Sequence, residues 1–533
     1  MYNNYTPLQQ RQLALQEYSN TQSTYLLVCA PTRSTALKAT LTDQLHCKFR
    51  LVDRLDGELT ASVDGVLLAA EDVELMSTAL MYFAKALQDG ADYAVCNAVF
   101  GFGGATALYQ SQPLQAQNRC AVVSRTLLER CRAAAHDPEN VPELLALAAQ
   151  LCTKPTLIPQ ALLHYERGIC AEDAFSAHGK RAFIMSHVLD MTGAPIVLVS
   201  AVPVLRSMGY EVLVLGPSDG GSLHLFLDAG ASVITRSSCR NVSDAWGMAL
   251  CADFVIANTV VMARAVRALS GTAVPVLWWL HDAFAGYPHI AHQIPTQLGE
   301  NVRVYSVGSH AANAMRAVRP EFEIRPLIYG LPDYAAENFV RTDLGYNRGR
   351  PLFATVGSFE RRKGHDIFCK AIRLLPPEVR EKASFLFVGQ AADKEMMDSV
   401  RTLTADYPEN VFYCKRLTRD EIKSLMEQCT GLVCASRDDP MPTFVTEGLI
   451  FGKPSIVSEH TGTAGLISEG RNGFVYHNDD PQQLAVLLEH AIEHPEELAS
   501  MRTECRKMYE QYYSKEAFEQ TLRAAVEDLT AKK

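Results

Sequence analysis

The sequence lacks several patterns that would assign it to a well-defined class. Its fourteen cysteines are scattered, and no two of them form a C-x-x-C pair. Zinc sites and thiol redox motifs need such close spacing, so we expect free thiols in a reducing compartment. No basic cluster with interleaved aromatic residues is present, and the formal net charge is -10. This disfavours nucleic acid as the main partner, because a phosphate backbone binds basic surfaces.

Signals for secretion or membrane insertion are also missing. The first residues, MYNNYTPLQQRQLALQEY, contain no basic segment followed by an apolar core, so they do not predict a signal peptide. The longest apolar run, APIVLVSAVPVL, is too short to span a bilayer and contains two prolines. We therefore expect a cytoplasmic protein. Its length of 533 residues, 48% of them hydrophobic, predicts roughly two to four packed domains.

From residue 181 onward, short apolar runs alternate with segments of helix length. AFIMSHV, EVLVLGP, DFVIANT, VPVLWWLH and VRVYSVG precede a polar stretch at 333–351, and PLFATVGS, SFLFVGQ, VFYC, GLVCAS, PSIVSE and GFVY follow it. Strands separated by helices form parallel sheets that are covered on both faces. We therefore predict an α/β fold with two doubly wound domains, at 178–340 and 341–533, the second ending in a helical tail.

The first part of the chain predicts a third α/β domain, at 1–172. TYLLVCAPT, KFRLVD, GVLLAAEDVEL and DYAVCNA read as strands, and the segment from Met76 to Leu87 reads as a helix. The boundary with the next domain falls between residues 170 and 180.

A basic cluster follows one of the predicted strands, in TVGSFERRKGHDIF. Gly357 allows a tight turn after the strand. Arg361, Arg362 and Lys363 then lie at the mouth of the sheet, where the N-terminus of the following helix also favours anions. This arrangement suits a pyrophosphate. A solvated basic turn is the alternative interpretation of the segment alone.

Two further candidates come from the preceding domain. Gly193 opens the helix in SHVLDMTGAPIVLV, without the G-x-G-x-x-G spacing of a dinucleotide site, and glycine at such a position is often only a steric requirement. His281 follows the strand in WWLHDAFAG, at the end where doubly wound sheets place reactive groups. A lone histidine at that position is more often structural, so both roles stay open.

The stretch SRDDPMPTFVTEGLIFGKP holds two carboxylates with seven residues between them, Asp439 on a loop and Glu447 in a helix-like run. Taken alone, Asp439 is a turn acid before Pro440. Glu447 alone is an acid near a helix N-terminus, where the helix dipole favours negative charge.

Together, these motifs resemble those of retaining glycosyltransferases of family 4, which have the GT-B fold. The two acids, followed by FGKPSIVSEHTG and GRNGFVY, match the C-terminal motif of that family. TVGSFERRKG resembles its pyrophosphate-binding strand and loop, and WWLHD resembles its histidine segment. The matching motifs occur in order between residue 181 and the end of the chain.

The resemblance implies a role for each matching residue. Glu447 is implied to bind the ribose hydroxyls of a nucleotide, and Asp439 to lie beside the transferred sugar. Lys363, helped by Arg362, is implied to neutralise the leaving diphosphate, and His281 to face the donor sugar.

The implied donor-binding set is wider than these residues. It also includes Gly193, Gly357, Ser358, Thr461 and Gly462. Two departures from the family pattern stand out. The first acid is usually glutamate, and Asp439 is one methylene shorter. The arginine that usually follows the strand glycine is replaced by Ser358, which leaves Arg361 or Arg362 to substitute for it.

By resemblance, the predicted function is retaining transfer of a sugar from a nucleotide diphosphate to a glycan or glycolipid acceptor, in bacterial surface polysaccharide synthesis. Cationic side chains and helix N-termini would stabilise the departing charge, without a metal or another cofactor. The alternatives are a sugar-nucleotide epimerase, a phosphorylase, or an inactive partner or chaperone of another transferase. Arg316, Arg319 and Arg325 cluster around a predicted helix and would allow a peripheral contact at the inner membrane face, with a solvated basic face as the alternative.

The segment from GVLLAAEDVEL to DYAV resembles the middle of family-2 GT-A glycosyltransferases, in which a strand ends in a metal-binding Asp-x-Asp. Ala69 occupies the first of these positions, which leaves only Glu71 and Asp72. Adjacent side chains on a strand point to opposite faces, so the two acids would not converge on one ion. We predict a degenerate, non-catalytic GT-A-like domain, with an unrelated α/β domain as the alternative.

Overall fold

A computed structural model describes most of the chain. The described residues are 24–30, 37, 40–41, 44, 48–69, 73–75, 78–102, 106–110, 120–165, 179–218, 220–236 and 248–531. Contacts between residues divide the chain into two compact units, 2–255 and 256–533.

The unit at 2–255 is built on a mixed sheet. Its strands, in the order in which neighbours pair, are β9 (Lys180–Met185), β10 (Tyr210–Gly216), β11 (Ser232–Arg236), β6 (Thr106–Gln110), β5 (Tyr93–Phe102), β7 (Cys120–Ser124), β3 (Gly65–Ala69), β1 (Tyr25–Cys29) and β2 (Lys48–Val52). Strand β8 (Pro155–Tyr165) pairs with β5 and with β4 (Glu74–Leu75). The helices are α3 (Ala79–Gln88), α4 (Arg125–Ala134), α5 (Val141–Leu151), α6 (Gly193–Ser207) and α7 (Leu223–Asp228).

The strands predicted in the first 172 residues are confirmed. β1 is buried on both faces, because Leu26 and Val28 belong to one hydrophobic cluster and Leu27 and Cys29 to another, as the two-residue period of a strand requires. The predicted helix begins at Ala79 in the structure, and its expected first residue lies outside the described residues. Ala69 ends β3, whereas the two acids at 71 and 72 also lie outside the described residues.

The unit at 256–533 contains a six-stranded sheet in which every pair is parallel. The strand order is β18 (Val411–Cys414), β17 (Ser384–Val388), β16 (Leu352–Val356), β19 (Gly431–Cys434), β20 (Ser455–Ser458) and β21 (Gly473–Tyr476). Its helices are α11 (His365–Leu374), α12 (Pro377–Arg380), α13 (Lys394–Asp406), α14 (Arg419–Gln428), α15 (Thr443–Ile450), α16 (Pro481–Glu493), α17 (Pro495–Ser500) and α18 (Arg502–Tyr512). The predicted strands of the chain's last third are all confirmed.

The helices of this sheet begin where local chemistry favours them. The start of α14 is a capping box, in which the Thr418 hydroxyl accepts the Glu421 N–H and the Glu421 carboxylate accepts the Thr418 N–H. This pair explains why the helix begins directly after Thr418.

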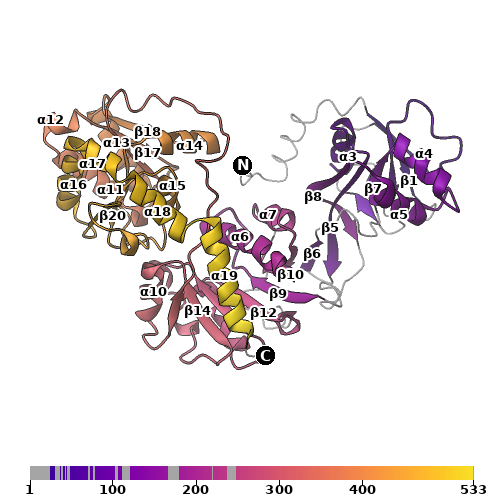
Figure 1. Cartoon of the computed structure of the whole chain (residues 1–533), viewed down its shortest axis with the longest axis horizontal. Coiled ribbons are helices and arrows are strands. Elements are labelled where there is room, and N and C mark those ends of the chain that lie inside the picture. The colour runs from indigo at the N-terminus through magenta and orange to yellow at the C-terminus, as the bar shows by residue number, and fades with distance from the viewer. Residues whose placement is uncertain are drawn as a thin grey trace. The chain divides into compact units, whose positions relative to one another are not determined.

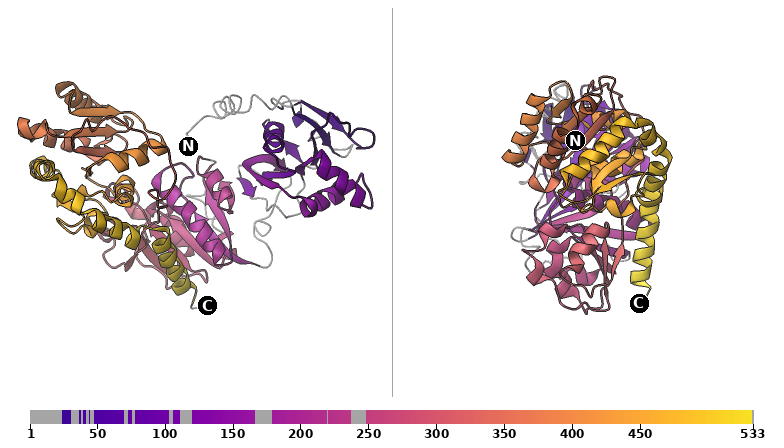
Figure 2. Two further views of the ribbon diagram at one scale, coloured as in Figure 1. Left: turned by 45° about the horizontal axis from the view of Figure 1, so that its top comes forward. Right: turned by 90° about the vertical axis from the view of Figure 1, so that its left-hand side faces the viewer.

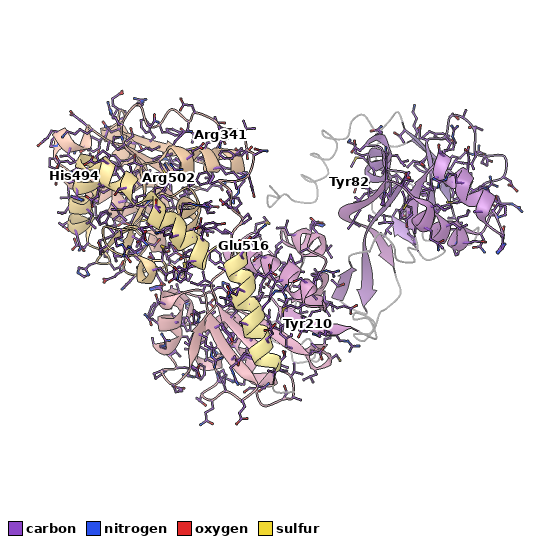
Figure 3. The ribbon with its side chains drawn as sticks, in the orientation of Figure 1. Tyr82, Tyr210, Arg341, His494, Arg502 and Glu516 are labelled. Carbon is purple, nitrogen blue, oxygen red and sulfur yellow. The ribbon has the colours of Figure 1, made fainter. Side chains whose placement is uncertain are left out.

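The rest of this unit is a smaller parallel arrangement. It contains β15 (Ile324–Pro326), β14 (Val302–Ser306), β13 (Val276–Leu280) and β12 (Phe254–Asn258), which crosses the unit boundary, together with α9 (Ala263–Leu269) and α10 (Ser309–Arg316). The last long helix, α19 (Lys515–Thr530), returns to these strands from the six-stranded part, as Figure 1 shows and the two views of Figure 2 repeat. Phe518 stacks on Trp279 of β13 with ring centroids 5.8 Å apart. Glu516, labelled in Figure 3, marks the start of this helix.

The order of the six strands places a site. The strand order reverses between β16 and β19, because β17 and β18 follow on one side and β20 and β21 on the other. In open parallel sheets, ligands bind beyond the carboxyl ends of the strands at such a switch point. The loops that leave β16 and β19 carry most of the residues that the sequence singled out.

Candidate functional site

Two loops meet at the switch point. We call residues 357–364, after β16, the basic loop, and residues 435–442, after β19, the acid loop. The basic loop ends at Gly364, whose φ of +65° lies in the left-handed region, where glycine is favoured. A Cβ at Gly364 would lie 1.8 Å from the carbonyl oxygen of Ala435. The two backbones therefore touch, and only glycine fits between them.

Two of the predicted site residues, one from each loop, form an ion pair. Lys363 Nζ lies 2.6 Å from Asp439 Oδ2, and the side chains are 21% and 4% exposed. Asp439 also accepts hydrogen bonds from the Ser436 hydroxyl at 3.3 Å and from the Met441 N–H at 3.3 Å. The positive charge of Lys363 is felt nearby, since burial first, and then this charge, lower the pKa of His365 to about 3. The ion pair therefore lies at the carboxyl end of the sheet, with Asp439 buried and Lys363 partly exposed.

Two other predicted residues of the basic loop, Arg362 and Ser358, are held by an acid of the same loop. Arg362 donates to Glu360 Oε1 at 3.0 Å and to the carbonyl oxygen of Asp438 at 3.1 Å. Ser358 donates to the same Glu360 oxygen at 2.7 Å. A Cβ at Gly357 would meet no atom within 4 Å, so the space beside the end of β16 is open.

Thr461 and Gly462 support Asp439 from behind. The N–H of Gly462 donates to the carbonyl oxygen of Asp439 at 2.9 Å, and a Cβ at Gly462 would lie 1.8 Å from the carbonyl oxygen of Pro440. The Thr461 hydroxyl is buried and donates to the carbonyl oxygen of Ser458 at 2.9 Å. In this structure both residues position the acid loop.

Glu447 lies in the second turn of α15. No acid lies in the first turn of this helix, and Glu447 is the fifth residue. The alternative interpretation, of an acid favoured by the helix N-terminus, is therefore wrong, because that effect fades beyond the first turn. Its Oε1 instead lies 2.6 Å from Nη1 of Arg419, and the guanidinium of Arg419 lies 4.1 Å over the ring of Tyr334.

The buried phenol of Tyr329 lies within the influence of both predicted acids. Its hydroxyl lies 3.3 Å from the Thr446 hydroxyl. Burial first, and then the negative charges of Asp439 and Glu447, raise the pKa of Tyr329 far above its usual value. Since both carboxylates act on one phenol, the structure brings them to the same region.

His281 follows β13, as predicted, with its ring centroid 4.7 Å from that of Trp279. The next residue, Asp282, accepts the Val260 N–H at 2.6 Å, and burial raises the pKa of Asp282 to about 6. Gly193, the first residue of α6, belongs to the other unit, so the structure does not place it relative to the two loops.

Asp438 joins the acid loop to the segment after His281. Its carboxylate accepts the N–H groups of Phe284 at 3.1 Å and Ala285 at 2.7 Å, and His310 Nε2 lies 2.7 Å from Oδ1. Burial alone would raise the pKa of Asp438, but the bonds from His310 and the two backbone groups outweigh it and lower the pKa.

Arg437 fastens the acid loop to α11. Its guanidinium binds both oxygens of Asp366, at 2.7 and 2.8 Å, and the two side chains are 15% and 11% exposed. It also donates to the carbonyl oxygen of Arg361 at 2.9 Å and binds Asp479 at 2.9 Å. This bidentate geometry is the strong form of an arginine–carboxylate contact.

The pair between Arg437 and Asp366 predicts a pH dependence of stability. Burial would raise the pKa of Asp366, but Arg437 outweighs it and lowers the pKa. The stabilisation is therefore complete above the unfolded pKa of about 3.9 and is lost as pH falls through the lower folded value. Asp366→Asn should cost about 3 kcal/mol at pH 7, and the difference from wild type should shrink below about pH 4 in urea unfolding. A difference that does not change down to pH 2 would contradict it.

Four residues of the site were not assigned a role from the sequence: Arg419, Arg437, Asp438 and His310. Their partners lie far away in the chain, 28 residues for Arg419, 71 for Arg437 and 128 for the contact between His310 and Asp438. No local pattern reports contacts of that separation.

Two families of known proteins match parts of the chain, and the second match contains both loops. Residues 178–318 match the family described as Glycosyl-transferase family 4, and residues 337–508 match the family described as Glycosyl transferases group 1. These two segments are glycosyltransferase domains of the GT-B type. We call residues 178–508 the GT-B region.

Individual relatives are distant in sequence. "Uncharacterized glycosyltransferase MJ1178" of Methanocaldococcus jannaschii is 26% identical over 197 residues, covering 36% of this chain and 53% of the relative. "Spore coat protein SA" of Bacillus subtilis is 27% identical over 160 residues, covering 28% of this chain and 41% of the relative. The matched stretches thus span about half or less of these relatives.

Solved structures support the GT-B fold. The crystal structure of Anabaena Alr3699/HepE in complex with UDP has a TM-score of 0.54 at 18% identity, covering 66% of this chain and 100% of that one. Sucrose-phosphate synthase from Thermosynechococcus elongatus has a TM-score of 0.53 at 16% identity, also covering 66% of this chain and 100% of that one.

The arginines considered as a membrane contact are largely occupied. Arg319 donates to the carbonyl oxygen of Ile294 at 2.7 Å, and Arg325 lies 2.8 Å from Asp528. Among these three described side chains, Arg316 is held locally, by a hydrogen bond from its Nη1 to Asn313 Oδ1 at 3.2 Å. None of the helices in the described part of the chain combines the length and apolar character needed to cross a bilayer.

Proposed function

We propose that the GT-B region transfers a sugar from a nucleoside diphosphate to an acceptor hydroxyl. The observation that carries this proposal is the ion pair between Lys363 and Asp439 at the switch point of the six-stranded sheet. The bond between the anomeric carbon and the diphosphate oxygen breaks, and its electron pair stays on the diphosphate. The acceptor oxygen forms the new bond on the face that the diphosphate leaves, and the hydroxyl proton passes to the departing diphosphate, so configuration is retained.

Each proposed role uses a contact described above. Lys363 and Arg362 would balance the charge that grows on the diphosphate, which is the electrostatic form of catalysis. Asp439 would hold Lys363 in place and face the sugar. Glu447 would accept the two ribose hydroxyls, with Arg419 orienting its carboxylate, and His281 would face the sugar from the other side.

The remaining parts of the chain take proposed roles from the resemblance. Residues 341–533 would bind the donor and residues 178–340 the acceptor, a glycan or glycolipid of surface polysaccharide synthesis. Residues 1–172 would be a degenerate GT-A-like domain without transfer activity of its own. UDP is a reasonable donor nucleotide to test, because the similar Anabaena structure was solved with it.

A second candidate is an inactive partner of another transferase. The observation that favours it is the position of Glu360, whose carboxylate binds both Ser358 and Arg362 in the basic loop. An acid there occupies groups that an arriving diphosphate would use. Binding of UDP and turnover of UDP-glucose, in the presence of a chelator, would distinguish an active transferase from this alternative.

Glu447→Ala should weaken UDP binding. Losing charge-assisted hydrogen bonds to a diol costs on the order of 1.5–3 kcal/mol, which is a tenfold to hundredfold loss of affinity by calorimetry. Glu427→Ala is the matched control, because this glutamate is 42% exposed and pairs with Arg341 on the surface. Equal UDP affinity for wild type and Glu447→Ala would refute the assignment.

A further inference from the structure

The carboxylate of Asp438 is unusual because its three donors come from two separate segments of the unit. Two of them are the first N–H groups of the 3-10 helix η5 (Phe284–Gly286), and the third is His310 on α10. The Asp438 side chain is 15% exposed and that of His310 is 6% exposed. A solvent-exposed turn residue would not accept three hydrogen bonds from donors more than a hundred positions away in the chain.

The protonation states follow from this geometry. The three bonds lower the pKa of Asp438, so the carboxylate is ionised and can only accept. His310 must therefore carry its proton on Nε2. Hydrogen bonds to an ionised group are roughly twice as strong as neutral ones, so Asp438 is a firm attachment point.

The packing beside Asp438 is tight as well. A Cβ at Gly308, just before α10, would lie 2.6 Å from Met441 Cε and 3.4 Å from the Cα of Gly462. A Cβ at Gly465 would lie 2.8 Å from the hydroxyl oxygen of Ser309. The start of α10 thus lies directly against the acid loop and the segment that supports it.

Asp438 and its neighbour Asp439 also contact the basic loop. The carbonyl oxygen of Asp438 accepts from Arg362, and the next residue, Asp439, pairs with Lys363. The Asp438 carboxylate therefore contacts the segment after His281, while its carbonyl oxygen and the Asp439 carboxylate contact the cationic side chains of the basic loop.

We propose that Asp438 is a positioning residue that fixes the segment after His281 and the start of α10 at a set distance from Asp439 and Lys363. The inference rests on the proposed sugar transfer. In that reaction, the contact would keep His281 aligned with Lys363 and Arg362 on opposite sides of the sugar. Misplacing reacting groups by about 1 Å can cost about a hundredfold in rate, so such an attachment has a measurable value.

The contact itself is tested by amide hydrogen exchange in the full-length protein. Asp438→Ala should raise the exchange rates of the Phe284 and Ala285 amides at least tenfold, because their acceptor is gone. Asp438→Asn keeps one acceptor oxygen and should give a smaller rise. Asp398→Asn, on the exposed face of α13, is the matched control and should leave both amides unchanged.

The positioning role is tested by turnover of UDP-glucose. Asp438→Ala should lower kcat about tenfold or more, and UDP affinity should stay within about twofold of wild type, because the proposed function gives the Asp438 carboxylate no contact with the donor. His310→Leu should lower kcat less, and adding it to Asp438→Ala should lower kcat no further, since the two act through one contact. Asp438→Asn should recover part of the loss.

The outcomes are separable. Unchanged exchange at Phe284 and Ala285 in Asp438→Ala would overturn the contact. Faster exchange with unchanged kcat would overturn the positioning role. Loss of UDP affinity in step with kcat would assign Asp438 to donor binding and overturn the inference. A wild-type protein without UDP binding or donor turnover would overturn the proposed function, and the positioning role with it, whereas exchange would still decide the contact. If Asp438→Ala fails to fold, His310→Leu and Asp438→Asn decide both arms.

Discussion

Lys363→Ala is expected to lower turnover of UDP-glucose by about a hundredfold or more, because removing one preorganised group that stabilises developing charge costs about 10²–10³ in kcat. The binding of uridine, which carries no phosphate, should not change. Measurements of kcat beside calorimetry with uridine and UDP would show this division. An equal loss of affinity for uridine and UDP would contradict a role at the diphosphate.

Stability needs its own control in this experiment. Lys363→Ala leaves Asp439, whose side chain is 4% exposed, without its cation, and breaking a buried ion pair costs about 3–5 kcal/mol. The double variant Lys363→Met/Asp439→Asn removes both charges and should recover most of the lost stability in urea unfolding. Its kcat should stay as low as that of Lys363→Ala. Recovery of kcat together with stability would mean that Lys363 only holds the fold.

Gly364→Ala is expected to destabilise the protein by about 2–5 kcal/mol. The left-handed backbone costs a residue with a side chain about 1–2 kcal/mol, and overpacking adds about 1–3 kcal/mol. The φ at Gly364 is +65°, and the new Cβ would lie 1.8 Å from the carbonyl oxygen of Ala435. Because a backbone atom occupies the space, the two loops must separate. Urea unfolding measures the loss.

Gly470→Ala is the matched control, because Gly470 has nearly the same backbone angle, +69°, and nothing within 4 Å of its Cβ. It should cost only about 1–2 kcal/mol, the share that comes from the backbone angle. Similar losses for both variants would show that the contact between the loops is unimportant.

The fold of the GT-B region was predictable because its strands are short apolar runs with a clear boundary on each side. β16 and β19 lie where the sequence placed them, and a parallel sheet then sets which ends of the strands meet. That is enough to bring Gly357, Lys363 and Asp439 near one another.

The pairing of side chains was not predictable in the same way. Lys363 and Asp439 were both singled out, but their direct contact, between residues 76 positions apart, depends on how tightly Gly364 lets two loops approach. The place of Glu447 in α15 depends on where the helix starts. Pro442 is the residue before its first turn, so the acid falls in the second turn.

The stack of Phe518 on Trp279, whose ring in turn lies beside His281, makes the site depend on the order of synthesis. The ribosome adds Phe518 long after His281, and at about 5–20 residues per second the delay is on the order of tens of seconds. During that time Trp279 lacks the aromatic ring that α19 stacks on it. The nascent chain therefore completes the aromatic stack beside His281 only after Phe518 has been added, long after β13 itself has been made.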